Sequence, residues 1–230
     1  MKHFVITILA ALFLTTTPAQ AKSLTIAGPP MASAEQAVNF IRINNPNPRI
    51  SCTIEEIVRL YYKEAGLEGI RPDVALSQAL LETGFFRYGG DVQPGQNNFC
   101  GLGSVGGGAR GASFATPELG VRAHIQHLVA YSRKSDPKTP IVNPRYQIVR
   151  RDSRRSGACR TWHDLDGLWA QVGIPYGDRI LNIHKRMLAT APAKSAAVSG
   201  AKQEAKKPGS GKKTKKNKPS DNESSANGKR

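Results

Sequence analysis

Asp73-Val-Ala-Leu-Ser-Gln-Ala-Leu-Leu-Glu82-Thr-Gly84 is the stretch of this 230-residue sequence that decides the fold. Pro72 stands just before it, and proline is favoured as the first residue of a helix. Gly84 closes it as a typical helix stop. The stretch therefore predicts a helix from Asp73 to about Thr83 that is mostly apolar and carries a carboxylate, Glu82, at its end.

The position of Glu82 does not favour a charged carboxylate. Its apolar neighbours Leu81, Phe85 and Phe86 raise the pKa of a carboxyl group, and the negative end of the helix dipole opposes its charge. A carboxyl group that stays protonated near neutral pH is the proton donor that a glycosidase needs. We therefore expect a general acid here. The simpler interpretation is an exposed residue near a helix end.

Five more helices are indicated. Ser33-Ala-Glu-Gln36 and Thr53-Ile-Glu-Glu56 are capping boxes, which start one helix through Ile43 and a second that stops at Gly66. Thr116-Pro117 starts another, and two more are expected at 165–172 and 177–188. The helix after Thr116 has an inward stripe of Val121, Ile125, Leu128, Val129 and Ser132.

The segment from Gly89 to Ala115 breaks this helical pattern, because it holds nine glycines in 27 residues. Two short apolar pieces, 98–102 and 112–115, predict a hairpin across the glycines at 106–108. The sequence therefore predicts a mainly α (α+β) fold, in which a helical domain carries a small β-hairpin lobe.

The two ends of the chain differ from the rest. Residues 1–21 combine a basic start, an apolar run of about eleven residues and Ala19-Gln-Ala21. This is typical of a secretory signal peptide cleaved after Ala21, and the run is short for a membrane anchor. We expect a linker at 22–32, one domain at 33–192, and a secreted or periplasmic protein without stable membrane insertion after cleavage.

The charge of the chain is concentrated in a tail at 193–230. The tail has eleven Lys and Arg against three acids and no aromatic residue, so it carries +8 of the total +16. Such a composition predicts disorder. The charge suits anionic envelope polymers, although a solvated linker is an equal alternative. Without aromatic rings to stack on bases, the tail is not expected to bind nucleic acid specifically.

Three cysteines, Cys52, Cys100 and Cys159, would meet an oxidising compartment. They cannot all pair with one another, so we expect one disulfide, with its pairing left open, and one buried thiol.

Other motifs do not support a cofactor or a metal. Gly101-Leu-Gly-Ser-Val-Gly106 has the letters of a dinucleotide-binding loop, but it lacks the strand before it and the helix after it. His124 and His127 have no third ligand at metal spacing. No Gly-x-Ser-x-Gly motif indicates a serine hydrolase.

Several stretches together resemble one known family. In their order and spacing, 75–84, 97–102, 114–128, 168–170 and 176–180 are similar to the glucosaminidase domain of glycoside hydrolase family 73 (mannosyl-glycoprotein endo-beta-N-acetylglucosaminidase-like), a lysozyme-like group of peptidoglycan hydrolases. The resemblance covers about Ser33 to Ala189. It implies a lysozyme-like fold and an endo-beta-N-acetylglucosaminidase that cuts peptidoglycan glycan strands after N-acetylglucosamine. The activity on mannosyl-glycoproteins that the family's name mentions ranks lower.

The resemblance also implies roles for single residues. Glu82 looks like the catalytic general acid, and Tyr176 looks like the tyrosine that holds the sugar near it. Asn97 and Asn98 match a segment whose amide groups bind N-acetyl or hydroxyl groups, and Phe99 packs beneath them.

One departure from the family concerns the second carboxylate, which the family takes from the lobe. No acid occurs between Cys100 and Pro117. Asp91 is the candidate that remains, because Glu118 is explained by the helix dipole. If Asp91 activates water, its carboxyl group should lie about 6.5 to 9.5 Å from the general acid. Otherwise the sugar's own acetamido group can act as the nucleophile.

Two alternatives to a hydrolase stay open. A non-catalytic wall-binding protein would keep the cleft only as a glycan-binding groove, which agrees with the missing acid and the basic tail. A lytic transglycosylase also needs only one acid, but it leaves a 1,6-anhydro muramic end.

Overall fold

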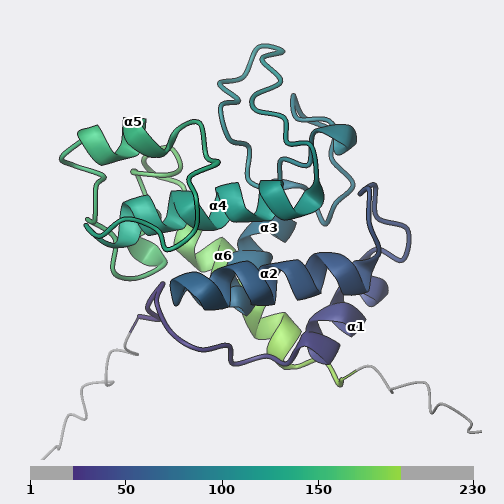
Figure 1. Ribbon diagram of the computed structural model, residues 1–230. Coiled ribbons are helices and arrows are strands. Elements are labelled where there is room, and N and C mark those ends of the chain that lie inside the picture. Colours follow the sequence, from purple (N-terminus) through teal and green to yellow (C-terminus); the bar gives the residue numbers. More distant parts are fainter. Residues whose placement is uncertain (1–22, 193–230) are drawn as a thin grey trace, which may run out of the picture. The chain divides into compact units, whose positions relative to one another are not determined.

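Six α-helices form the regular structure of residues 23–192, the part of the chain that the computed structural model describes (Figure 1). In chain order, with two 3₁₀ turns, the elements are α1 (Ala34–Asn44), α2 (Ile54–Glu68), α3 (Pro72–Glu82), η1 (Pro94–Gln96), α4 (Pro117–Ser132), α5 (Tyr146–Arg151), η2 (His163–Leu165) and α6 (Tyr176–Leu188). The mainly helical fold class is thereby confirmed. None of the described helices is long and apolar enough to cross a membrane. The predicted signal peptide and tail lie outside the described residues.

Side-chain caps start the helices where the sequence predicts them. Ser33 and Gln36 form a complete capping box at α1, and Thr53 accepts a hydrogen bond from a backbone amide in the first turn of α2. The second helix runs two residues beyond the predicted stop at Gly66. It ends instead at Gly69, whose φ of 70° supplies the left-handed turn that glycine adopts without strain.

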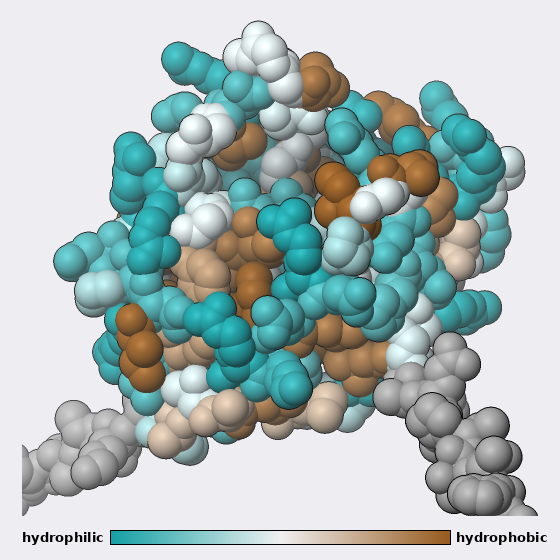
Figure 2. Space-filling view, turned by 180° about the vertical axis from the view of Figure 1, so that it is seen from behind, coloured by the Kyte–Doolittle hydropathy of each residue, from teal (hydrophilic) through white to brown (hydrophobic). Residues whose placement is uncertain are grey.

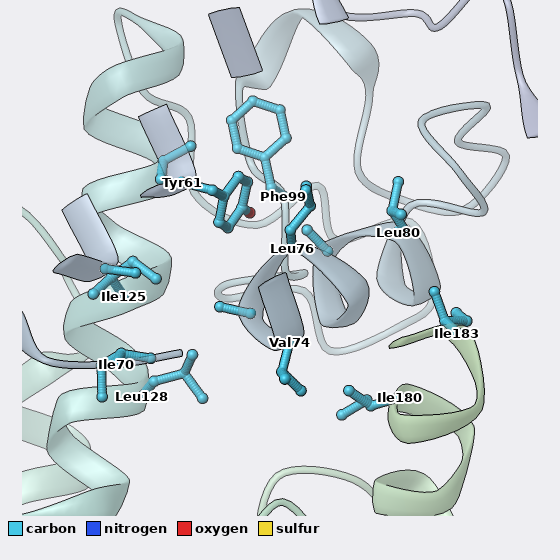
Figure 3. Close-up of a cluster of buried hydrophobic side chains, with 14 of the residues drawn as sticks. Tyr61, Ile70, Val74, Leu76, Leu80, Phe99, Ile125, Leu128, Ile180 and Ile183 are labelled. Carbon is cyan, nitrogen blue, oxygen red and sulfur yellow. The ribbon is translucent and has the colours of Figure 1, made fainter. Parts of the chain in front are cut away.

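The third helix, α3, forms the centre of the hydrophobic core, because every residue from Pro72 to Leu80 is buried. Figure 3 shows Val74, Leu76 and Leu80 of α3 among side chains of α2, α4 and α6. Burying an apolar side chain of this size contributes about 1.5–3 kcal/mol. The predicted stripe of α4 is also buried, but so is every residue of this helix from Ala123 to Ser132, so burial does not single out one face.

A buried, hydrogen-bonded carboxylate fixes the start of α3. Asp73 accepts hydrogen bonds from the backbone amides of Met31 and Ala32 at 2.7 and 2.8 Å, and its Oδ2 lies 2.8 Å from His184 Nε2 of α6. Burial alone would raise the pKa of Asp73, but these partners outweigh it and the pKa is lowered. The charged carboxylate therefore ties α3 to α6 and to the segment before α1.

That segment, residues 23–32, was expected to be a linker, and it packs against the helices. Ile26 is fully buried, and isolated bridges join Thr25 to Thr161 and Ala27 to Ile70. The segments around Ile70 and Thr161, which are far apart in the sequence, thus both lie beside residues 25–27.

The region between α4 and α6 differs from the prediction. Residues 165–172 form η2 and turns instead of the expected helix, because Gly167 adopts a φ of 71°, which breaks helical geometry. A short helix that the sequence analysis does not predict, α5, follows Asn143. The side chain of Asn143 caps a turn there by accepting from the Arg145 amide at 2.8 Å.

The lobe, residues 89–115, lies above α4 in Figure 1 and contains no strand. Its two arms are joined by backbone hydrogen bonds from Ala112 N to Leu102 O and from Phe114 N to Gln96 O, both 2.8 Å. The expected hairpin is therefore an open loop. Glycines with positive φ at 101, 103, 106, 107, 108 and 111 turn the chain too often for a regular ladder.

The prediction of a disulfide is wrong for this structure, since Cys52, Cys100 and Cys159 are all free. They lie in different places. Cys52 is half-buried before α2, Cys100 is buried in the lobe, and the buried Cys159 donates from Sγ to the Asp164 carbonyl at 3.2 Å. Burial raises the pKa of Cys159 to about 12, so its thiol stays protonated and unreactive.

Candidate active site

A cleft of about 530 Å³ opens at the end of α3. Three stretches form it: the end of α3 with the loop after it, the lobe, and the segment from Trp169 to Arg179. On the face turned away in Figure 1, hydrophilic side chains surround smaller apolar patches (Figure 2). The two acids that line the cleft are Glu82 and Asp91.

The carboxyl group of Glu82 is open to solvent through the cleft, yet the surrounding walls remove much of its hydration. This loss raises its pKa above the ordinary value. Hydrogen bonds from Tyr176 and Trp169 and the charge of Arg179 act in the opposite direction, but they do not cancel it. Glu82 therefore has the raised pKa that the sequence predicts.

The Tyr176 hydroxyl lies at the start of α6 and donates to Glu82 Oε1. The Tyr176 hydroxyl oxygen in turn accepts from Gln78 Nε2 at 2.8 Å, and Gln78 stands one turn before Glu82 on α3. The buried Tyr176 hydroxyl is thereby held between Gln78, which donates to it, and the Glu82 carboxyl group, to which it donates.

The hydrogen bonds continue through the core. Gln78 Oε1 lies 2.9 Å from His124 Nε2 of α4, and His124 Nδ1 lies 2.9 Å from the Tyr61 hydroxyl of α2. Burial lowers the pKa of His124 to about 3, so its ring is neutral and carries one proton. Because Gln78 Oε1 can only accept, that proton is on Nε2, and Nδ1 accepts from Tyr61.

The bonds therefore run in one direction, from Tyr61 through His124, Gln78 and Tyr176 to Glu82, and link α2, α4, α3 and α6. His124 belongs to this network rather than to a metal site. The described residues contain no group of three or more side chains placed to hold a metal ion.

Asp91 lies in the same cleft, near the start of the lobe. Its Oδ1 accepts from the Gly108 amide at 3.1 Å, which ties the start of the lobe to its tip. The structure thus brings Asp91 and Glu82 to one cleft. The role of Asp91 as the second carboxylate stays a prediction.

Asn97, Asn98 and Phe99 have internal partners. Asn97 adopts a φ of 50°, accepts from the Ser51 hydroxyl and donates to the Phe114 carbonyl. Asn98 lines the cleft, but its amide bonds to the lobe backbone. Phe99 packs edge-on against two core rings. The structure places these residues as the frame of the lobe, and their contact with sugar stays a prediction.

Three residues of the site were not predicted: Gln78, Trp169 and Arg179. Trp169 lines the cleft and packs edge-on against His127 with ring centroids 4.8 Å apart. All three stand in the stretches that resemble the family, at 75–84, 168–170 and 176–180. Their position in these stretches was the signal that the sequence offered. Their roles, however, depend on contacts between residues of four helices, which the sequence does not show.

A model of the glucosaminidase family, described as mannosyl-glycoprotein endo-beta-N-acetylglucosaminidase, matches residues 58–188, more than half of the chain. The chain belongs to the glucosaminidase family. The matched part includes α3 with Glu82, the lobe, and α6 with Tyr176. Membership of the glucosaminidase family supports a peptidoglycan-hydrolase type of function.

One curated relative matches the chain, but its description names no activity. An uncharacterized protein of Borreliella burgdorferi (strain ATCC 35210 / DSM 4680 / CIP 102532 / B31) is 37% identical over 118 residues, which cover 51% of this chain and 55% of the relative. The chain thus spans about half the length of the relative it matches. No solved structure matches the chain.

Proposed function

We propose that the chain is a peptidoglycan hydrolase that cuts the glycan strand after N-acetylglucosamine, with Glu82 as the general acid. The observation that carries this proposal is the carboxyl group of Glu82 itself. It lies in an open cleft, its pKa is raised, and the hydroxyl of Tyr176 is held on it. A carboxylate with only a structural role would not be stabilised by this placement.

In the proposed reaction, protonated Glu82 gives its proton to the glycosidic oxygen as the bond between that oxygen and the anomeric carbon breaks. Water adds to the anomeric carbon and the leaving sugar departs as an alcohol. Glu82 is then a carboxylate, and the Tyr176 hydroxyl, the Trp169 indole and the charge of Arg179 stabilise that charge. The same groups orient the acid before the step.

The base for the attacking water is Asp91, since it shares the cleft with Glu82. Its hydrogen bond from Gly108 makes its position depend on the lobe. Substrate assistance by the acetamido group is the alternative mechanism, and the two differ in stereochemistry. Asp91 acting on water inverts the anomeric centre, whereas acetamido participation retains it.

The test is Glu82→Gln, which keeps the shape of the side chain and removes the proton. We expect no new reducing ends from purified sacculi, with an unchanged circular dichroism spectrum. Glu118→Gln is the matched control, because this partly exposed acid at the start of α4 pairs with Lys63 and Arg122 outside the cleft. It should cut at the wild-type rate. Undiminished activity of Glu82→Gln would refute the role of Glu82.

Mass spectrometry of the products tests the reaction type in the same digest. Reducing N-acetylglucosamine ends support the proposal. A 1,6-anhydro muramic end would make the protein a lytic transglycosylase, and binding to sacculi without any product would make it a glycan-binding protein. Both results contradict the proposed hydrolysis.

A further inference from the structure

A second cavity, of about 170 Å³, adjoins the catalytic cleft. The two share Cys100, Gly101, Ser104 and Trp169, so Trp169 stands between them. The remaining lining of the second cavity comes from α4, from the segment around α5 and from residues beside the shared ones: Leu102, Gly103, His127, Tyr131, Arg145, Arg155 and Leu168. No acid is among these residues.

Two guanidinium groups reach this cavity with little compensation. Arg145 has no carboxylate within ion-pair distance in the described part of the chain. Arg155 has a single contact, 3.5 Å to Asp152, and Asp152 is shared with Arg154 at the same distance. Both residues line the cavity and the charges of both act on the same buried ring, His127, so the arrangement favours an anion in the cavity.

The histidine in this cavity adds a hydrogen-bond donor. His127 Nδ1 lies 3.0 Å from Asn143 Nδ2, an amide nitrogen that can only donate, so Nδ1 accepts. Burial first, and then the charges of Arg145 and Arg155, lower the pKa of His127 to about 3, which keeps the ring neutral. Its single proton is therefore on Nε2, and within residues 23–192 no hydrogen-bond partner of Nε2 is found.

We propose that this cavity, the anion pocket (His127, Tyr131, Arg145 and Arg155 with the shared residues), binds a carboxylate of the substrate beside the sugars in the catalytic cleft. Guanidinium groups bind carboxylates through paired hydrogen bonds, and the cavity is large enough for one such group. The stem peptides of peptidoglycan carry free carboxylates next to the glycan strand. The pocket thereby makes the enzyme prefer peptide-bearing strands to neutral glycans. This inference rests on the proposed function.

The binding experiment uses the full chain with Glu82→Gln, so that no ligand is consumed. One probe is a soluble muropeptide with free carboxylates, and the other is the same muropeptide with its carboxylates converted to carboxamides. We expect the acidic form to bind more tightly by calorimetry. Arg145→Gln and Arg155→Gln should each weaken the binding of the acidic form about tenfold and leave the carboxamide form unchanged.

Arg151→Gln is the matched control, since Arg151 is exposed at the end of α5 and does not line the anion pocket. It should change neither affinity, although it removes the same charge. Equal affinities of the two muropeptide forms, or an equal loss in the control, would overturn the proposal. So would a loss of inorganic phosphate binding in Arg145→Gln with muropeptide binding intact, because the pocket would then serve a phosphate instead.

Turnover separates this inference from the function on which it rests. If the wild-type chain releases no reducing ends from sacculi, the proposed hydrolysis fails. If the wild type cuts but Arg145→Gln and Arg155→Gln show the wild-type KM, only the anion pocket fails. The expected result is a raised KM with kcat nearly unchanged, because the contact is made equally in the ground state and the transition state.

Discussion

Removal of one hydroxyl group from the cleft, by Tyr176→Phe, is expected to shift the pH dependence of the reaction upwards. The general acid acts only while protonated, so the rate falls as pH rises through the pKa of Glu82. The Tyr176 hydroxyl stabilises the carboxylate and thus lowers that pKa, against the larger effect of burial. Without the hydroxyl, Glu82 keeps its proton to a higher pH.

The size of the shift follows from the lost hydrogen bond. A hydrogen bond to a charged group is worth about 1.5–3 kcal/mol. Water from the open cleft replaces part of it, so we take the lower end, which corresponds to an upward shift of about one pKa unit. The maximal rate should fall as well, because the Glu82 carboxylate that forms when the proton is transferred is no longer stabilised by the Tyr176 hydroxyl.

The assay is the initial rate of reducing-end release from solubilised glycan strands between about pH 4 and pH 9, a range that brackets a raised carboxyl pKa. Tyr146→Phe is the matched control, since its buried hydroxyl donates to another carboxylate, Asp136, at 3.1 Å, outside the cleft. This control should keep the wild-type limb at high pH. A limb that stays in place or moves to lower pH in Tyr176→Phe would refute the assignment of Glu82 as the titrating acid.

Three further substitutions test the packing that positions the site. Gly120→Ala would place a methyl carbon 1.8 Å from the Asn97 carbonyl oxygen, so we expect a loss of about 3 kcal/mol or more in urea unfolding. Gly66→Ala in α2 meets nothing within 4 Å and should instead gain about 0.5–1 kcal/mol, and an equal loss in both would contradict the steric argument. Asp73→Asn removes the charge beside His184 and should cost about 3–5 kcal/mol at pH 7. Because the pKa of Asp73 is lowered in the folded protein, its carboxylate stabilises the fold fully above the unfolded pKa near 3.8. This stabilisation is lost as pH falls through the folded pKa. The difference in unfolding free energy between the wild type and Asp73→Asn should therefore shrink at pH 3.

The helices that begin at local caps, and the raised pKa of Glu82, could be predicted because their causes are local. The capping side chains at Ser33, Thr53 and Thr116 act within one turn, and Pro72 and Gly84 mark the two sides of α3. The raised pKa of a carboxylate among apolar neighbours also follows from a short stretch. These features need no knowledge of what lies across the core.

The parts that were missed depend on contacts between distant segments. Gln78 reads as a polar interruption of an apolar helix until α4 and α6 place His124 and Tyr176 on its two sides. The open lobe results from glycines such as Gly111, whose Cβ would lie 2.5 Å from the Leu102 carbonyl oxygen. Composition alone shows that glycine is frequent there, but it does not show which backbone atoms approach each other.

The burial of α3 gives the two walls of the cleft different opening energies. Every residue from Pro72 to Leu80 is buried, so we expect the backbone that leads to Glu82 to open only together with much of the core. The opposite wall is the lobe, whose arms are joined by two backbone hydrogen bonds and by side-chain bonds of Gln96 and Asn98, and we expect it to open at lower free energy than α3. Under the proposed function, a glycan strand would enter by displacing the lobe, while the backbone that carries Glu82 stays in place.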